Sequence, residues 1–132
     1  PPYFLPNFAP VHTKEFRALI AQAQRLSTTI RFESGQTTVD SRGVADLERV
    51  RDWLNGPGAK RPITLVGHSS ADGEFGANVV LSQIRAREVD ARLRALGLPA
   101  SQILGMGPVQ PVACETSVEN ANLNRRVEIW VR

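Results

Sequence analysis

Arg85 is the residue whose chemistry fits its predicted surroundings least well. Leu81, Val89 and Leu93 recur at helical spacing, and Arg85 lies four residues from both Leu81 and Val89, inside the same apolar stripe. A guanidinium on the packed side of a helix stays charged, so it must find an acceptor or lie at the edge of a cleft. Two interpretations follow: a structural ion pair at the rim of the core, or a bidentate clamp for a ligand carboxylate.

The segment HSSADGEFGAN lies between a predicted strand and the helix that carries this arginine. Ligands gather where strands end and helices begin in folds that alternate the two. Ser69 and Ser70 offer hydroxyl groups, Asp72 offers a carboxylate, and Asn78 is predicted to cap the helix. The alternative interpretation is a polar turn in which Gly73 supplies backbone freedom.

A hydrolytic site is the third chemical possibility in this segment. His68, Ser69, Ser70 and Asp72 include a base, nucleophiles and a carboxylate. Adjacent side chains at the end of a strand alternate in direction, however, and GHSSA lacks the second glycine of the G-x-S-x-G elbow. Cys114 has no base partner near it in the sequence. We therefore expect no enzymatic activity.

Composition and charge narrow the classes of partner. The 132 residues are 42% hydrophobic and 22% charged, which fits one folded domain. Sixteen Lys and Arg against 13 Asp and Glu give a net charge of +3, with no long basic run that would indicate nucleic acid binding. One cysteine and two histidines make a metal site unexpected, and no cofactor motif appears. No apolar run is long enough to span a bilayer, and the start of the chain lacks the pattern of a signal peptide.

The elements that must position these residues follow from periodicity and turn signals. Residues 1–10 are predicted to form an irregular arm, and a helix begins at Thr13, which can cap it. The remaining predicted elements are a strand over 28–32, a helix from a cap at Asp40 or Ser41 to Leu54, a strand over 62–67, a helix over 78–96, a strand over 101–104, a loop to Asn124 and a strand over 127–131. This order predicts an α+β sandwich of βαβαβ-β type, with a mixed sheet, helices packed on one face, and the extra N-terminal helix.

Two motifs resemble those of the OmpA-like peptidoglycan-binding domain, the C-terminal domain of OmpA. They are GHSSADGEFGANVVLSQIRAREVDARLRALG and the closing NRRVEIWV. The resemblance covers 28–132 and leaves 1–27 as an arm and helix that pack on the domain. Within the family, VACETSVENANLNRRVEIWVR looks most like the module fused to periplasmic phosphate-binding-type proteins.

The resemblance implies non-covalent attachment to the cell wall in the periplasm, near the outer membrane, without catalysis. Family members hold the diaminopimelate of the peptidoglycan stem peptide between the Asp of a GHTD motif and the Arg of an RA pair. The arginine corresponds to Arg85, but Ser69 and Ser70 replace the Thr and Asp. A hydroxyl lacks the carboxylate's charge, which predicts binding weaker by about tenfold or more unless Asp72 or Glu33 supplies that charge.

Two functions follow from these residues. The first is a wall-binding module whose ligand residues are Arg85, Ser70, Ser69, Asp72, Asn78, Arg125 and Glu33. The second is a domain that keeps the fold but makes protein contacts or forms a homodimer, as the missing Asp and the aromatic arm with Tyr3, Phe4 and Phe8 suggest. For Arg125 the alternative is simple surface charge at the end of a strand.

Overall fold

The structure is a computed structural model that describes residues 11–132. These residues contain four helices and four strands. The predicted arm, with Tyr3, Phe4 and Phe8, lies outside these residues. In chain order the elements are α1 (Thr13–Gln22), β1 (Gln24–Arg31), α2 (Ser41–Leu54), β2 (Ile63–Gly67), α3 (Phe75–Ala95), β3 (Gln102–Gly105), α4 (Val118–Asn124) and β4 (Arg126–Val131).

The four strands form one mixed sheet in the order β1-β4-β2-β3. β2 and β3 are parallel because α3 connects them as a crossover, whereas β4 is antiparallel to both of its neighbours, β1 and β2. The predicted mixed α+β architecture is therefore confirmed. The two central strands, β4 and β2, carry the loops that lead into the candidate site.

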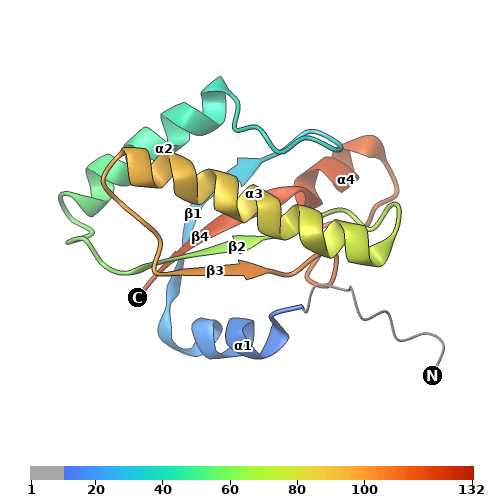
Figure 1. Cartoon of the computed structure of the whole chain (residues 1–132), viewed down its shortest axis with the longest axis horizontal. Coiled ribbons are helices and arrows are strands. Elements are labelled where there is room, and N and C mark those ends of the chain that lie inside the picture. Colours follow the sequence, from blue (N-terminus) through green and yellow to red (C-terminus); the bar gives the residue numbers. More distant parts are fainter. Residues whose placement is uncertain (1–10) are drawn as a thin grey trace.

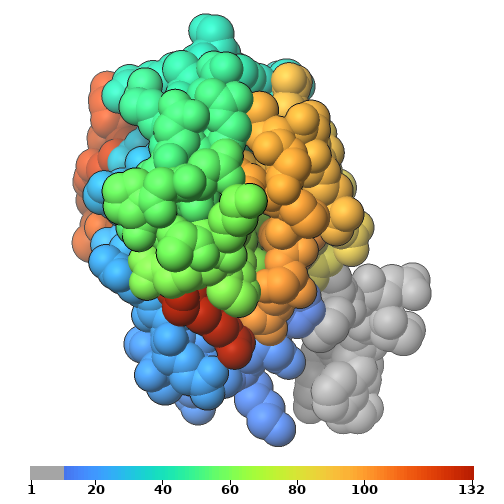
Figure 2. All heavy atoms as spheres, turned by 90° about the vertical axis from the view of Figure 1, so that its left-hand side faces the viewer, coloured from blue at the N-terminus to red at the C-terminus, as the bar shows by residue number. Residues whose placement is uncertain are grey.

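Helices cover both faces of this sheet. α2 and α3 lie on one face, and the extra helix α1 packs on the other (Figure 1). Figure 2 shows the same layers from the end of the sheet, with the red end of β4 between the green residues that follow α2 and the blue residues of α1 and β1. Because both faces are covered, every residue of β2 is buried.

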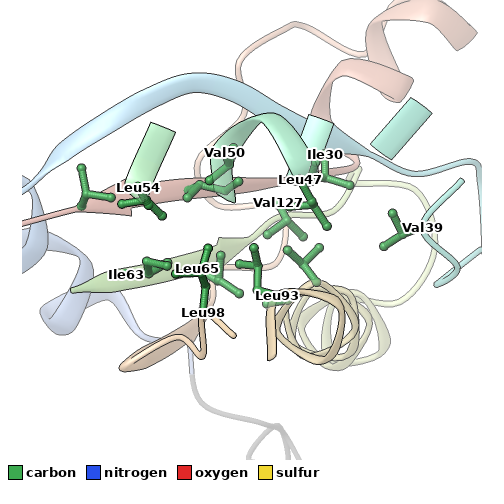
Figure 3. Packing of buried hydrophobic residues seen from close by; sticks show 14 of the residues in the cluster. Ile30, Val39, Leu47, Val50, Leu54, Ile63, Leu65, Leu93, Leu98 and Val127 are labelled. Atoms are coloured by element: carbon green, nitrogen blue, oxygen red, sulfur yellow. The ribbon is translucent and has the colours of Figure 1, made fainter. Parts of the chain in front are cut away.

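The larger core lies between the sheet and the two helices α2 and α3. Alternate residues of β2 and β4, among them Leu65 and Val127, meet Leu47 and Val50 of α2 and Leu93 of α3 (Figure 3). α2 begins where Asp40 caps its first turn, since its Oδ1 accepts from the Gly43 amide at 2.8 Å. The predictions of a cap at Asp40 and a helix end at Leu54 are confirmed.

The smaller core lies under α1 on the opposite face. Phe16 and Leu19 of α1 pack against three buried residues on this face of the sheet. They are Val66 of β2, Leu104 of β3 and Met106, the residue after β3. The start of α1 is also tied to the edge strand, because the Gly105 amide donates to His12 Nδ1 at 3.0 Å. α1 thus closes a sheet face that would otherwise expose apolar side chains.

Several predicted boundaries were wrong. α3 begins at Phe75 rather than at Asn78, and Thr13 lies inside α1, whose N-cap His12 makes no capping side-chain bond. The predicted loop before the last strand contains α4. β1 begins at Gln24 rather than at residue 28, so it starts within the segment 1–27 that was predicted to precede the domain. The domain boundary between residues 27 and 28 itself stays a prediction. No helix within residues 11–132 is both long and apolar enough to cross a membrane.

Candidate ligand-binding site

Arg85 is fully buried in α3, with 0% of its surface exposed, which confirms the apolar-stripe argument. Its Nε donates to the Gln36 carbonyl at 2.9 Å and its Nη2 to the Glu33 carbonyl at 3.2 Å. The guanidinium also lies over the ring of Phe32, with Cζ 5.4 Å from the centroid. Both carbonyl bonds come from the turn after β1, so this turn holds one side of the guanidinium fork.

The opposite side of that fork has no partner among residues 11–132. Nη1 of Arg85 is buried and forms no hydrogen bond with any described residue. No carboxylate of residues 11–132 lies within 4.0 Å of the guanidinium, so the structure contains no ion pair that neutralises it. Burial, together with the nearby charge of Arg125, lowers the pKa of Arg85 to about 10, while Asp72 opposes the shift. The side chain is therefore a buried cation at neutral pH.

The close approach of α3 to β2 fixes the position of this cation. A side chain at Gly67 would meet the Ser82 carbonyl at 1.9 Å, so only glycine allows the strand and helix to touch there. Ser82 is itself small and buried, and its Oγ accepts from the Gly107 amide at 2.9 Å. Arg85 follows one helical turn later, beside the turn that contains Glu33 and Gln36.

Asp72 is the carboxylate that the structure brings to the predicted site. The buried Ser70 hydroxyl donates to Asp72 Oδ1, and this hydrogen bond is the main reason that the pKa of Asp72 is lowered. Burial opposes this shift, and the charges of Arg125 and Arg85 lower the pKa further. The Asp72 side chain is 64% exposed, and its Oδ2 lies 3.9 Å from Nη2 of Arg125. Serine at position 70 thus holds a carboxylate that comes from two residues further along the loop.

Asn78 and Arg125 complete this cluster. Nδ2 of Asn78 donates to the Asp72 carbonyl at 2.6 Å, so its side chain ties the loop to α3 instead of capping the helix. Arg125 is 5% exposed, and its Nη1 donates to the side chain of Asn122 in α4. Buried Arg85 and Arg125 and exposed Asp72 therefore make a site with two cations and one anion.

Glu33 and Ser69 contribute less than the sequence suggested. Glu33 offers its backbone carbonyl to Arg85, but its exposed carboxylate makes no ion pair with residues 11–132. Ser69 is buried, its amide donates to the Gly107 carbonyl at 3.0 Å, and its Oγ has no partner among the described residues. Of the two acids considered as a replacement for the missing Asp, only Asp72 forms an ion pair with one of the two arginines, Arg125.

Glu115 is a site residue that the sequence analysis missed. Its two carboxylate oxygens accept from the Ala71 amide at 2.9 and 2.8 Å, and Oε2 also accepts from Asn124 at 2.9 Å. These bonds fix the loop over residues 68–74, here called the serine loop, to the long segment before β4. No periodicity or motif marks Glu115, because it acts through a contact between segments 44 residues apart.

The hydrolytic alternative finds no support in the geometry. His68 lies under α1, edge-on to Phe16, with its Nε2 3.3 Å from Glu128 Oε1. The Ser70 hydroxyl donates to Asp72 instead. His68 and Ser70 thus serve two different clusters, and because β2 ends at Gly67 the loop, not the alternation of the strand, sets their directions.

Fold and site together define a small α+β binding domain with a buried, unneutralised arginine. The model of the OmpA family matches residues 31–125, and the chain belongs to that family. The predicted family is therefore confirmed.

Three similar proteins show how far this likeness extends. The probable lipoprotein YiaD of Escherichia coli is 32% identical over 79% of this chain and 48% of its own length. The peptidoglycan-binding protein ArfA of Mycobacterium bovis is 39% identical over 64% of this chain and 26% of its own length. The solved structure of the cell wall anchor of the T6SS from Pseudomonas aeruginosa superimposes with a TM-score of 0.66 at 29% identity, covering 89% of this chain and 91% of that one. The chain thus spans about half of YiaD and about a quarter of ArfA.

Proposed function

We propose that the domain binds the stem peptide of peptidoglycan without covalent chemistry and anchors its parent protein to the cell wall in the periplasm. The observation that carries this proposal is the buried Nη1 of Arg85, which has no partner among the described residues while the rest of the guanidinium is held by backbone carbonyls. A buried, unpartnered donor on a cation costs free energy, and a ligand carboxylate is the partner that removes this cost.

The arrangement of charges suits the zwitterionic end of diaminopimelate. The ligand carboxylate would contact Arg85 and Arg125, and the ammonium would contact Asp72, which the Ser70 hydroxyl holds in place. Asn78 and Glu115 fix the loop that carries these groups. Each charge of the ligand thus meets the opposite charge, which favours a zwitterion over a simple anion.

Access to Arg85 requires a local movement. Because the guanidinium is 0% exposed, a carboxylate reaches Nη1 only when the serine loop or the turn containing Glu33 and Gln36 shifts. Both are loop segments, which move more easily than the helix and strands that carry them. Binding therefore converts a closed state, in which the guanidinium is covered, into a state in which Nη1 contacts the ligand carboxylate.

The similar proteins support the proposal at the level of their names. ArfA is called peptidoglycan-binding, and the type VI secretion structure is called a cell wall anchor. The family is one of binding and anchoring domains, so we propose a function without catalysis. The finer resemblance to modules fused to phosphate-binding-type proteins gains no support from these comparisons, and it stays a prediction.

Calorimetric titration with a diaminopimelate tripeptide of the stem tests the proposal. We expect the domain to bind this tripeptide saturably. It should not bind the matched tripeptide that has lysine in place of diaminopimelate, because lysine lacks the second carboxylate. Asp72→Asn should weaken binding by about tenfold, because a charge-assisted contact to the ammonium becomes a neutral one. Arg85→Ala should abolish binding, and Arg85→Lys, which keeps the charge but not the fork, should weaken it.

The matched control is Asp52→Asn, an exposed acid of α2 that is 70% exposed and remote from these contacts. It should bind like the unmodified domain. Absence of heat at millimolar tripeptide, or equal affinity for the lysine peptide, would contradict the proposal. Because Asp72 is exposed, its variant is expected to fold, so the test does not depend on the buried arginine alone.

A protein-contact function is the second candidate, and exposed apolar side chains favour it. Val80 and Ile84 on α3 are 40% and 41% exposed, and Val118 on α4 is 72% exposed. Sedimentation of the domain over a range of concentrations separates the two functions. A monomer that binds the tripeptide supports wall binding, whereas a dimer disrupted by Ile84→Ser supports the alternative.

A further inference from the structure

A cavity of about 490 Å³ lies beside the arginine site, between β1, the first turns of α2, and α4. Figure 1 shows β1 ending between these two helices. The volume falls in the range of small-molecule sites. The cavity does not include Arg85 or Asp72, so it is distinct from the site proposed above.

Three residues connect the cavity to the arginine site. Phe32 and Glu33 line the cavity, and Arg85 packs on the Phe32 ring and donates to the Glu33 carbonyl. Asn122 also lines it and accepts from Arg125. A ligand held by the two arginines is therefore adjacent to this cavity, separated from it by single side chains.

The cavity runs along the outer edge of β1. Successive side chains of a strand point to opposite faces, yet Ser27, Thr28 and Thr29 all line the cavity. β1 pairs only with β4, and its register shifts between Arg25 and Thr29. This edge therefore offers hydroxyl groups, and also backbone N–H and C=O groups with which no other described strand pairs.

The charges of the lining nearly cancel. Arg31 and Arg42 supply two cations, and neither forms an ion pair with residues 11–132. Three acids also line the cavity: Glu33, Asp40 and Asp46. The Asp40 carboxylate caps α2, and Asp46 is paired with Arg49. The cavity thus combines donors and acceptors without a net charge that would select an ion.

Such a lining fits a neutral ligand rich in hydroxyl and amide groups. A sugar hydroxyl both donates and accepts, so it can use carboxylates, guanidinium groups and threonine hydroxyls together. A second peptide carboxylate would meet the three acids as well as the two arginines, so charge gives it no net advantage over a neutral sugar. In peptidoglycan the stem peptide is attached to an amino sugar that carries an N-acetyl group.

We propose that the cavity along the edge of β1 is a subsite for the N-acetylated sugar of the wall glycan, next to the stem-peptide site. This inference rests on the proposed function and extends it from the peptide to the glycan. Thr28 and Arg42 are the residues that contact the sugar. The domain thereby recognises the junction of sugar and peptide, not the peptide alone.

Titrations with matched ligands test this subsite. The ligands are the diaminopimelate tripeptide and the same tripeptide joined to its N-acetylated disaccharide. We expect the sugar-bearing ligand to bind about tenfold more tightly, since it adds two or more hydrogen bonds. Thr28→Val, which keeps the shape, and Arg42→Gln should remove this gain and leave the tripeptide affinity unchanged. Arg87→Gln, an exposed arginine of α3, is the control and should keep the gain.

The outcomes separate this inference from the proposed function. If the tripeptide binds and the disaccharide adds no affinity, or if the gain survives in both variants, the subsite is wrong and wall binding stands. If the tripeptide does not bind, the proposed function fails, and the subsite is then judged from amide shifts in NMR. Millimolar disaccharide alone should shift the amides of Thr28 and Thr29, and the absence of these shifts overturns the subsite.

Discussion

At the residue scale, the proposed site uses the carboxylate of Asp72, which the Ser70 hydroxyl holds. Position 70 carries a hydroxyl where the family motif has an acid, and Asp72 lies against that hydroxyl from two residues further on. We propose that this pair takes the role of the one aspartate, with the hydroxyl buried and the charge exposed. The hydrogen bond from Ser70 keeps the pKa of Asp72 below its usual value, so the charge persists at acidic pH.

An exchange of these two residues tests whether they act as one group. Ser70→Asp alone places a second carboxylate beside Asp72 at a position that is 4% exposed. Repulsion between like charges should cancel the benefit of restoring the family acid, so the tripeptide should bind no more tightly than to the unmodified domain. The double variant Ser70→Asp, Asp72→Ser should recover binding that Asp72→Ser loses by about tenfold.

Calorimetry with the same tripeptide gives the comparison, and the coupling between the two changes is read from the four affinities. Additive effects would show that the two positions act independently. A large gain from Ser70→Asp alone would show that Asp72 does not occupy the place of the missing acid.

The sequence predicted that Arg85 faces the packed side of its helix, but not which residues surround it. Arg85 was evident because a cation in an apolar helical stripe is visible from spacing alone. Gln36, Glu115 and Asn122 were not, because they act through a carbonyl or through contacts across the fold. Glu33 contributes its backbone carbonyl and not the carboxylate for which it was predicted.

At the scale of elements, the position of α3 depends on a glycine in β2. A Cβ at Gly67 would overlap the Ser82 carbonyl of α3, which cannot move without shifting the helix. We expect Gly67→Ala to lower the free energy of unfolding by about 1–3 kcal/mol and to weaken tripeptide binding, because Arg85 moves with the helix. Urea unfolding and calorimetry measure the two effects.

Gly56→Ala is the matched control for this prediction. Gly56 follows α2, and an added methyl group would meet its nearest atom, the Asp52 carbonyl, at 3.4 Å, an ordinary contact. Its effect on unfolding should stay within about 0.5 kcal/mol. Equal stability of Gly67→Ala and Gly56→Ala would show that α3 tolerates a shift, and would remove the argument that this contact positions Arg85.

Helix boundaries show what periodicity alone could not predict. α3 begins three residues before Asn78, because Asn78 uses its side chain to bind the Asp72 carbonyl and not to cap. α4 is short, and only Asn124 of its residues is buried, so the sequence carried no apolar stripe for it. Its Ser117 cap and the hydrogen bond that Asn124 donates to Glu115 stabilise it instead.

At the scale of the whole molecule, α1 covers a buried charged cluster on the far side of the sheet. His68 and Glu128 are 1% and 4% exposed, and Nε of Arg126 donates to Glu128 at 2.9 Å. Burial would raise the pKa of Glu128, but the His68 hydrogen bond and Arg126 lower it to about 2. Burial lowers the pKa of His68, so the folded protein holds a neutral imidazole next to a carboxylate.

This cluster predicts a loss of stability in acid. Because the folded protein binds a proton at His68 less readily than the unfolded chain, the free energy of unfolding should fall as the pH drops below about 6.5. The slope should approach about 1.4 kcal/mol per pH unit, and Glu128 should add a further loss below its usual pKa of 4.5.

Urea unfolding between pH 7.5 and 5 measures this slope. His68→Gln should reduce it in that range, since the variant has no imidazole to titrate. An equal slope in both proteins would mean that other groups cause the acid sensitivity, and that the His68 cluster is not linked to folding.

The sequence by itself determined the family, the mixed sheet and the inward-facing arginine, because these follow from periodicity and from two motifs read along the chain. Only the tertiary structure decided that Asp72 rather than Glu33 pairs with Arg125, that α1 closes the far face of the sheet, and that a polar cavity follows the edge of β1. The physical reason is that charge pairing and cavities depend on distances between atoms far apart in sequence, whereas periodicity reports only which side of an element a residue faces.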